Sequence, residues 1–251
     1  MTPWRVAPLF AAIFAISVSA SASLAADMPV VKAPVAPPKV VFGNLFYGID
    51  ADTHGDLAGY LGVLYAPYGM HQSGVRFTAF GIYGKYEYDS GPTEIDGRFW
   101  SGDLLIGWSN VVANGAATLS VGANYQDHRL SPFDPSNSVV GSEWGFKVQG
   151  DFWVTPSPNW LVVGLASYST AFDTYYANFR VGYDWKNGSG VYFGPELAAL
   201  GNERTDQVRA GLHVTGIKLG SAAKLNVSGG WMHVRDEGDG WYGTATVDVS
   251  F

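Results

Sequence analysis

The sequence ends in Trp241-Tyr-Gly-Thr-Ala-Thr-Val-Asp-Val-Ser-Phe251, where two kinds of side chain alternate without interruption. The odd positions carry Trp, Gly, Ala, Val, Val and Phe, and the even positions carry Tyr, Thr, Thr, Asp and Ser. Because successive side chains of a β-strand point to opposite faces, this pattern predicts a strand with one apolar and one largely polar face. Its length is about what a tilted strand needs to cross a bilayer.

Two fold classes use such a strand. It can end a soluble β-sandwich, or it can close a transmembrane barrel whose apolar face contacts lipid. The terminal aromatic residue Phe251 resembles the last residue of bacterial outer-membrane barrels, which serves as a signal for the barrel assembly machinery. The rest of the chain has to distinguish the two classes.

Residues 1–25 predict a secretory signal peptide. Arg5 precedes an apolar run over residues 7–20, and the small-residue stretch Ser21-Ala-Ser-Leu-Ala25 follows it. The run is shorter than the roughly 20 residues that a membrane-spanning helix requires. The chain contains no cysteine, so it forms no disulfide and lacks the residue that a lipoprotein acylates.

The composition of the exported part narrows its partners. Without Arg5, 14 Lys and Arg (15 less one) stand against 22 Asp and Glu, a net charge of −8 that disfavours nucleic-acid binding. Aromatic residues make up 15% of the chain, as large a share as the charged residues, and there are 32 glycines. This mixture fits lipid-facing strands in contact with outer-membrane lipids better than a single dry core.

Residues 26–40 predict a periplasmic tether, because four prolines within 27–40 prevent this segment from joining a central strand. Residues 41–251 predict an all-β domain, an antiparallel transmembrane barrel of about twelve strands. Turn-forming clusters such as Asn114-Gly115 separate the strands. The strands are expected at 41–53, 56–68, 74–88, 95–109, 115–127, 141–154, 159–171, 174–186, 190–201, 205–216, 223–235 and 240–251.

An even number of strands places both ends of the barrel on one side of the membrane. If that side is the periplasm, short turns should follow the even-numbered strands, and long outward loops should be found after odd-numbered strands. The two loops expected from the sequence are residues 89–96 and residues 127–140.

The tryptophans provide a distance test. Trp100 and Trp108 lie on one face of a predicted strand, about 20 Å apart along the membrane normal, which approaches the separation of two aromatic girdles. A soluble sandwich gives no reason for tryptophans to gather near strand ends. The predicted membrane-interface aromatics are Trp100, Trp108, Trp144, Trp160, Trp185, Trp231 and Trp241.

Charged residues on the opposite faces of the strands would point into the barrel. In a narrow barrel such charges either pair and fill the lumen or line a polar pore, and twelve strands fit both cases. The predicted lumen residues are Asp50, Asp103, Glu143, Lys147, Asp151, Arg180, Asp184, Glu196 and Arg209.

No catalytic residue can be nominated. The five histidines fall in no recognisable Ser-His-acid arrangement, and their spacing gives no metal site, so neither metal nor cofactor is expected. Aromatic residues near the predicted mouths offer faces on which sugar rings stack. The histidines are His54, His71, His128, His213 and His233, and the aromatics are Tyr86, Tyr88, Phe133, Trp241 and Tyr242.

Longer phrases in the chain resemble one family. They are Asp127-His128, Leu130-Ser-Pro132 with Asp134-Pro135, Gly141-Ser-Glu-Trp-Gly-Phe-Lys-Val-Gln-Gly150, Tyr168-Ser-Thr-Ala-Phe-Asp173, Gly194-Pro-Glu196, Leu200-Gly-Asn-Glu203 and, less closely, Trp100-Ser-Gly-Asp103. They resemble the cellulose biosynthesis protein BcsS family of alphaproteobacteria.

The resemblance implies an outer-membrane component of cellulose production that acts where the glucan leaves the cell or attaches to its surface. Because no catalytic residue can be nominated, we expect a non-enzymatic barrel that assists cellulose biosynthesis, export or surface attachment. Cellulose or cellulose synthase components would then be its partners. Two alternatives stay open from the sequence, a porin-like channel for small solutes and a barrel-embedded hydrolase.

Overall fold

The computed structural model describes residues 40–235 and 237–251. The signal peptide predicted at 1–25 and the tether predicted at 26–40 lie outside these residues, apart from Val40. In the described part, no helix has the length and apolar character needed to cross a membrane.

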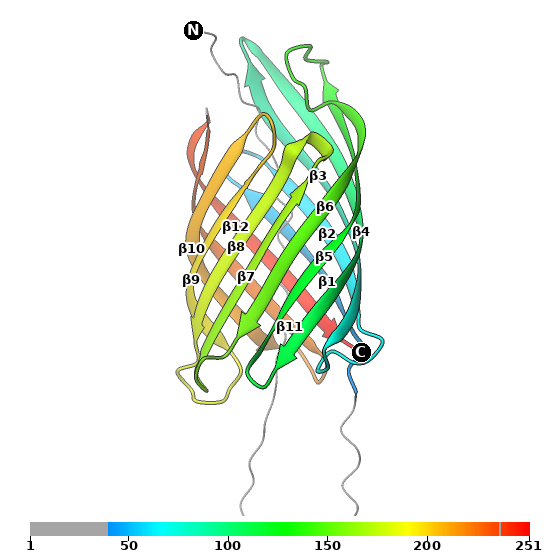
Figure 1. Cartoon of the computed structure of the whole chain (residues 1–251). Coiled ribbons are helices and arrows are strands. Elements are labelled where there is room, and N and C mark those ends of the chain that lie inside the picture. The colour runs from blue at the N-terminus through cyan, green and yellow to red at the C-terminus, as the bar shows by residue number, and fades with distance from the viewer. Residues whose placement is uncertain (1–39, 236) are drawn as a thin grey trace, which may run out of the picture.

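Twelve antiparallel strands form one closed barrel (Figure 1) in which each strand pairs with its two neighbours along the chain, and β1 pairs with β12. The predicted fold, a twelve-strand antiparallel barrel closed by the C-terminal strand, is confirmed. The strands are β1 (Gly43–Asp52), β2 (Leu57–Tyr65), β3 (Gly74–Ser90), β4 (Thr93–Val112), β5 (Gly115–Ser131), β6 (Gly141–Val154), β7 (Trp160–Ser169), β8 (Thr174–Tyr183), β9 (Tyr192–Gly201), β10 (Asp206–Lys218), β11 (Ala223–Val234) and β12 (Gly238–Ser250).

The first and last strands close the barrel in a continuous ladder that runs from Asn44 opposite Ser250 to Asp52 opposite Tyr242. The ladder continues into the terminal residue, because the Phe251 N–H donates to the Gly43 carbonyl at 3.1 Å. A Cβ atom at Gly43 would lie 2.3 Å from the Phe251 ring, so this position has no room for a side chain. Both ends of the barrel therefore lie at one rim (Figure 1).

Two expectations about the connections are wrong. Residues 89–96 form no loop, because β3 and β4 stay paired up to Ser90 opposite Thr93. Gly91 adopts the positive φ of 65° that a two-residue hairpin turn uses, which lets the ladder continue to the tip. Residues 66–73 and 184–191, which follow even-numbered strands, are longer than the short turns expected there.

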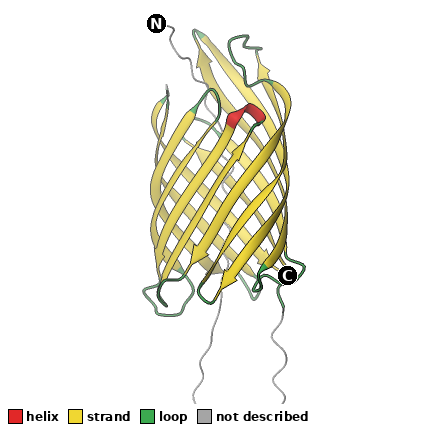
Figure 2. Cartoon of the chain, in the orientation of Figure 1, coloured by secondary structure: helices red, strands yellow, loops and turns green. Residues whose placement is uncertain are grey.

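The long loop expected after the fifth strand is present, although β5 runs on to Ser131 and shortens it to residues 132–140. It lies at the rim opposite the start of β1 and the end of β12. At that rim a 3-10 turn, η1 (Ala171–Asp173), connects β7 to β8 (Figure 2). We call this rim the outer mouth, and we call the rim where β1 begins and β12 ends the inner mouth.

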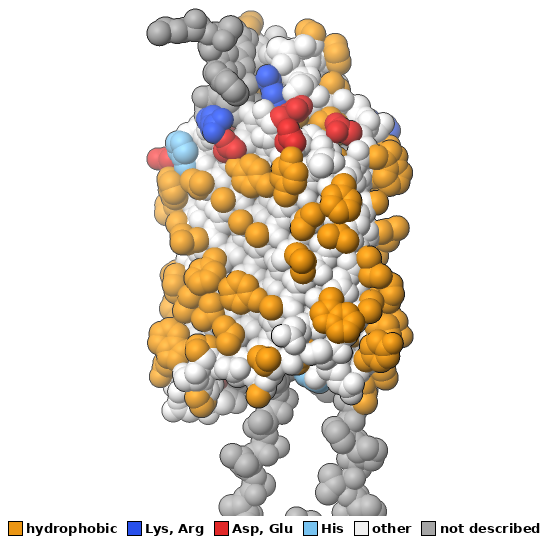
Figure 3. Space-filling view, viewed as in Figure 1, with side chains coloured by type: hydrophobic (Ala, Val, Ile, Leu, Met, Phe, Trp, Pro, Cys, Tyr) orange, Lys and Arg blue, Asp and Glu red, His pale blue; other side chains and the backbone are white. Residues whose placement is uncertain are grey.

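The wall separates two environments, because side chains alternate between its faces. In β12 the odd residues from Trp241 to Val249 face outward and the even residues from Tyr242 to Asp248 are buried inside. Figure 3 shows hydrophobic side chains spread over the outer surface, with charged side chains gathered near the outer mouth. The exterior is therefore an apolar belt with a charged edge, which suits lipid contact.

Candidate functional site

A hydrophobic core crosses one level of the barrel interior, where the sequence alone predicted only charged residues. The core joins Phe46, Tyr60 and Phe80 on one wall to Tyr176 and Leu200 on the opposite wall. The rings of Phe46 and Phe80 stack with centroids 6.3 Å apart. Since side chains from opposite walls are in one packed cluster, this level of the lumen is closed.

Strands β2, β3 and β7 supply much of this core, and their sequences explain why it was missed. They are apolar on both faces, so alternation alone does not show which face is inside. A continuous apolar run bounded by turns is the signal for a strand that is buried on both faces, here by lipid outside and by the core inside.

Six of the nine predicted lumen charges form ion pairs inside the barrel. The Arg209 guanidinium donates to both Asp50 oxygens, at 2.8 and 3.0 Å, and both side chains are at most 2% exposed. Thr244 donates a further hydrogen bond to Asp50 at 2.9 Å. Two donors therefore satisfy this buried carboxylate, as its burial requires.

The other two ion pairs connect neighbouring parts of the wall. Arg180 on β8 pairs with Glu196 on β9, and the Tyr242 hydroxyl donates to the same carboxylate at 2.7 Å. Lys147 on β6 lies 2.5 Å from the Asp103 carboxylate on β4. These pairs neutralise charge within the lumen and leave it packed.

Uncharged side chains extend this network, and the sequence reading omitted them. The Asn124 amide donates to Asp103 at 2.6 Å, while its oxygen accepts from Gln126 and from Ser169, both at 2.8 Å. The signal was present in β5, where Asn124, Gln126 and His128 alternate with outward residues. A search restricted to charged residues passes over such a polar stripe.

The remaining predicted lumen charges are placed differently. Glu143 and Asp151 on β6 are half-buried and form no ion pair within the described part of the chain. Asp184 does not lie on a strand, because β8 ends at Tyr183. Its carboxylate accepts hydrogen bonds from Ser189 and from three backbone N–H groups of the following turn, and these outweigh the effect of burial and hold its pKa below the usual range. Asp184 therefore shapes a turn at the inner mouth.

The loop at 132–140 folds over the outer mouth. The Tyr88 hydroxyl donates to Asp134 at 3.0 Å and accepts from Asn137 at 2.8 Å. Asp134, Asn137 and Val139 are buried as a result. This loop closes part of the mouth above the packed core.

Only two of the five aromatics suggested as sugar platforms are accessible. Tyr86, Tyr88 and Tyr242 are buried, and the first two stack on each other inside the barrel. Phe133 is 67% exposed in the mouth loop, and Trp241 is 65% exposed on the outer wall. Of the five, therefore, only Phe133 and Trp241 have a face that a sugar ring could contact.

All seven tryptophans predicted at the membrane interface lie exposed on the outside of the barrel. Trp231 and Trp241 are directly opposite each other near the outer mouth, whereas Trp160 and Trp185 flank the turns of the inner mouth. Trp153, which the sequence reading left out, faces inward and is buried. The exposed tryptophans thus concentrate toward the two edges of the belt.

Four of the five histidines have structural partners. His128 stacks on Phe99 at 5.5 Å, and His213 lies 2.9 Å from the Thr215 hydroxyl. His54 lies 3.3 Å from Glu237, and His233 lies 2.7 Å from Asp239. No group of three His, Asp or Glu residues in the described ranges could hold a metal ion.

Comparison with solved structures returns other barrels at low identity. The β domain of the Bordetella autotransporter BrkA is 13% identical, with 84% of this chain and 99% of that chain covered and a TM-score of 0.39. The TodX deltaS2S3 mutant monoaromatic hydrocarbon channel is 9% identical, with 85% of this chain and 90% of that chain covered and a TM-score of 0.44. The outer membrane protease OmpT from Escherichia coli is 10% identical, with 84% of this chain and 94% of that chain covered and a TM-score of 0.33. We draw no functional conclusion from similarity at this level.

No curated protein matches the sequence. The profile of one family, "Cellulose biosynthesis protein BcsS", matches residues 44–251, which span the whole barrel from the first strand to the terminal Phe251. The resemblance found in the sequence is confirmed: the chain belongs to the cellulose biosynthesis protein BcsS family.

Proposed function

We propose that this protein is a non-enzymatic barrel of the bacterial outer membrane that assists cellulose biosynthesis from its outer surface, at the stage of glucan export or attachment to the cell. Family membership supports the link to cellulose biosynthesis. The apolar exterior, edged by tryptophans, supports a place in the membrane. The periplasmic side would be the inner mouth, where the first strand begins and the last strand ends.

The packing of the lumen is the observation that supports a barrel through which the glucan does not pass. A conduit needs a continuous polar opening, whereas this interior is crossed by aromatic side chains and by three buried ion pairs. The partner surface would then be the outer mouth, where Phe133 and Trp241 are exposed and a sugar ring could stack on them. Cellulose, or a cellulose synthase component, is the proposed partner.

The first experiment is deletion of the gene under cellulose-producing conditions, with cell-bound and released cellulose measured separately. Attachment predicts that total cellulose is maintained and shifts into the medium, whereas export predicts that the total falls. Unchanged amounts in both fractions would overturn the cellulose assignment. Complementation with the wild-type gene should restore the original distribution.

The porin-like alternative makes an electrical prediction. A small-solute channel would show steady conductance in a planar bilayer, whereas the packed interior predicts none for the purified barrel. If the wild type does not conduct but the Arg209→Ala variant does, the ion pair between Arg209 and Asp50 closes a latent pore. Steady conductance of the wild type would overturn the proposal.

The hydrolase alternative is tested through the histidines. Because His128 and His213 are held by aromatic and hydroxyl neighbours, their replacement by Gln should leave cellulose output unchanged when the variant barrels assemble normally. Loss of output with normal assembly would instead identify an enzyme.

A further inference from the structure

Three cations form a row on the outer wall near the outer mouth. The strand register places Lys85 on β3 directly opposite Arg98 on β4, and Arg98 directly opposite Arg129 on β5. All three side chains are exposed, Lys85 by 53% and Arg129 by 80%. We call Lys85, Arg98 and Arg129 the cationic row.

The charges of this row are only partly balanced by the protein. Like charges directly opposite in neighbouring strands repel. Arg129 pairs with Asp127 at 2.9 Å, and Lys85 lies 3.7 Å from Glu87, but Arg98 makes no ion pair with any residue of the described ranges. Glu87 and Asp96 oppose each other one step farther from the membrane belt. An anion that approaches from the belt side therefore meets Lys85 and Arg98 before these two carboxylates, whereas Asp127, which is 16% exposed, lies on the belt side of Arg129.

An aromatic edge lies immediately below the row. Tyr83 and Trp100 oppose each other, two residues closer to the barrel centre than Lys85 and Arg98. The Trp100 ring contacts the Tyr125 ring, with centroids 4.7 Å apart, and the Tyr125 ring contacts the Trp144 ring at 4.8 Å. Aromatic residues of this kind mark the membrane interface, so the cationic row stands at head-group level.

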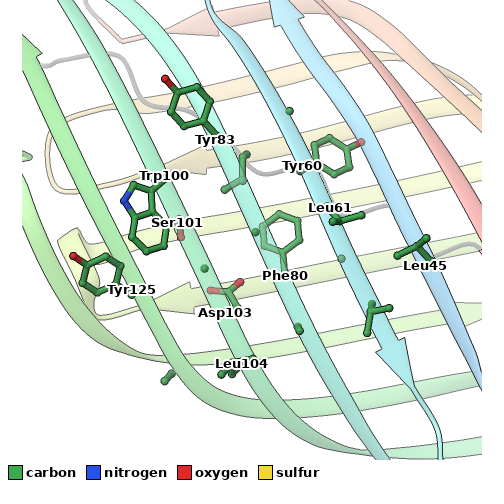
Figure 4. Close-up of a pocket in the computed structure, with 18 of the residues that line it drawn as sticks. Leu45, Tyr60, Leu61, Phe80, Tyr83, Trp100, Ser101, Asp103, Leu104 and Tyr125 are labelled. Carbon is green, nitrogen blue, oxygen red and sulfur yellow. The ribbon is translucent and has the colours of Figure 1, made fainter.

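Below the aromatic edge the outer wall is hollowed. The hollow has a volume of about 1310 Å³, and its floor includes Gly81 and Gly102, which are opposite each other on β3 and β4. Cβ atoms at these glycines would find their nearest neighbours only at 3.9 and 3.7 Å. Figure 4 shows Tyr83, Trp100 and Tyr125 along one edge of the hollow, with Leu104 and Leu61 farther along the wall. We call it the wall groove.

We propose that the cationic row and the wall groove together bind an outer-leaflet lipid that carries phosphate on its head group and several acyl chains, a lipid A-type molecule. The phosphates would contact Arg98 and its two neighbours, since guanidinium groups bind phosphate in a two-point geometry. The acyl chains would fill the apolar groove over Gly81 and Gly102. This inference rests on the membrane placement proposed above.

A second copy of the chain fits the groove less well. Two copies in one membrane have the same orientation, and a symmetric contact brings the same patch of each together. The two cationic rows would then face each other at the same depth, and their repulsion would oppose the contact. A phosphorylated lipid supplies the missing negative charge and also fills the groove.

The first test uses the wild-type barrel in detergent micelles and two probes, lipid A with its phosphates and the same lipid A after dephosphorylation. Bound lipid is counted by native mass spectrometry across a titration. The proposal expects phosphorylated lipid A to bind at least tenfold more tightly. Equal binding of both probes would overturn it, and no variant is needed for this comparison.

The cationic row is tested by the triple variant Lys85→Gln, Arg98→Gln and Arg129→Gln. The matched control removes three exposed cations elsewhere, Lys186→Gln, Lys218→Gln and Arg235→Gln, with the same change in net charge. Only the first variant should lower affinity for phosphorylated lipid A at least tenfold, down to the level of the dephosphorylated probe. An equal loss in the control would show that net charge alone attracts the lipid and would overturn the site.

The wall groove is tested without altering charge. Gly81→Leu with Gly102→Leu fills the floor, and Gly150→Leu with Gly243→Leu is the control, because both control positions are open to the outside with no atom within 4 Å of a Cβ. The first variant should weaken lipid A binding several-fold while the control binds as wild type. Unchanged binding in the filled groove would overturn the proposed place of the acyl chains.

Two further measurements separate the possible failures. Because the chain contains no cysteine, Gly102→Cys introduces a single thiol. Efficient disulfide cross-linking of two copies in membranes would show that a second copy occupies the groove and would overturn the lipid proposal. Membrane fractionation of the wild-type protein tests the placement by itself, so a barrel found in the outer membrane without lipid A selectivity refutes only this inference.

Discussion

Arg209 on β10 and Asp50 on β1 form a two-point ion pair across the lumen, with N–O distances of 2.8 and 3.0 Å, although β11 and β12 separate their strands in the wall. Removing one residue of such a pair leaves the charge of the other residue buried without a partner. We therefore expect Arg209→Gln to lower the free energy of unfolding by about 3–5 kcal/mol, measured by urea denaturation in micelles.

The control for this prediction is Arg235→Gln. Its ion pair with Asp206 is accessible to solvent, so its loss should cost about 0–1 kcal/mol. Combining Arg209→Gln with Asp50→Asn should cost less than the two single changes together, because the stranded carboxylate is removed as well. If Arg209→Gln proves no more damaging than Arg235→Gln, the pair does not hold the lumen.

The carboxyl group of Asp56, in the loop between β1 and β2, should make the stability of the protein depend on pH. Burial, with Asp52 and Glu237 nearby, raises its pKa to about 9. The folded protein thus keeps a proton on Asp56 that the unfolded chain releases near pH 4. The contribution of this proton to the free energy of unfolding is therefore complete below about pH 4 and is lost as the pH rises to about 9. Asp56→Asn, which mimics the protonated form, should be more stable than wild type at pH 8, with a smaller difference at pH 5.

Asp134 provides the opposite case. Burial alone would raise its pKa, but hydrogen bonds from Ser136 and Tyr88 outweigh burial and hold the pKa below the usual range. Its stabilising contribution is therefore present at neutral pH and is lost on acidification, so Asp134→Asn should destabilise at pH 7. If both variants shift stability in the same direction at pH 8, the assigned pKa directions are wrong.

Tyr88→Phe should loosen the loop over the outer mouth. The hydroxyl is bonded to both Asp134 and Asn137, and its removal leaves these buried groups with fewer partners, at a cost of about 1–3 kcal/mol. Limited proteolysis should then cut within residues 132–140 faster than in wild type. Tyr47→Phe, on the outer wall, is the control and should leave the cleavage rate unchanged.

Removal of Phe251 should impair assembly in the outer membrane, because the residue extends the closing ladder and packs its ring over Gly43. Phe251→Trp keeps an aromatic terminus and should assemble better than the truncated chain. The readout is heat-modifiable migration of membrane fractions on a gel. Normal assembly of the truncated chain would refute a signal role for this residue.

Asp248→Asn looks harmless in the sequence, where the residue is one polar side chain of an inward face. The structure predicts a cost, because Asp248 accepts from the amides of Asn44 and Asn226, and an amide at this position would turn one donor toward another. The expected loss is about 1–3 kcal/mol in urea denaturation, with Asp248→Ala worse. An unchanged midpoint for Asp248→Asn would support the simpler view from the sequence.

The fold could be predicted because the two faces of most strands differ in polarity. Trp241 to Val249 shows this clearly, and turn residues such as Asn114 locate the ends of strands. The lumen pairs were harder to foresee, because alternation places Arg209 and Asp50 inside but carries no information about the distance between them. The cationic row depends on the register of three strands, which single-strand patterns do not contain.

The packed interior also bears on how the barrel responds to mechanical load. Tyr86 and Tyr88 of β3 lie in the same cluster as Tyr176 of β8 and Leu200 of β9, so opposite walls are braced against each other. A pull applied to the β3–β4 hairpin would therefore be shared with the far side of the barrel. The core therefore couples strands that are far apart around the wall, so a deformation of one side would have to move the side opposite.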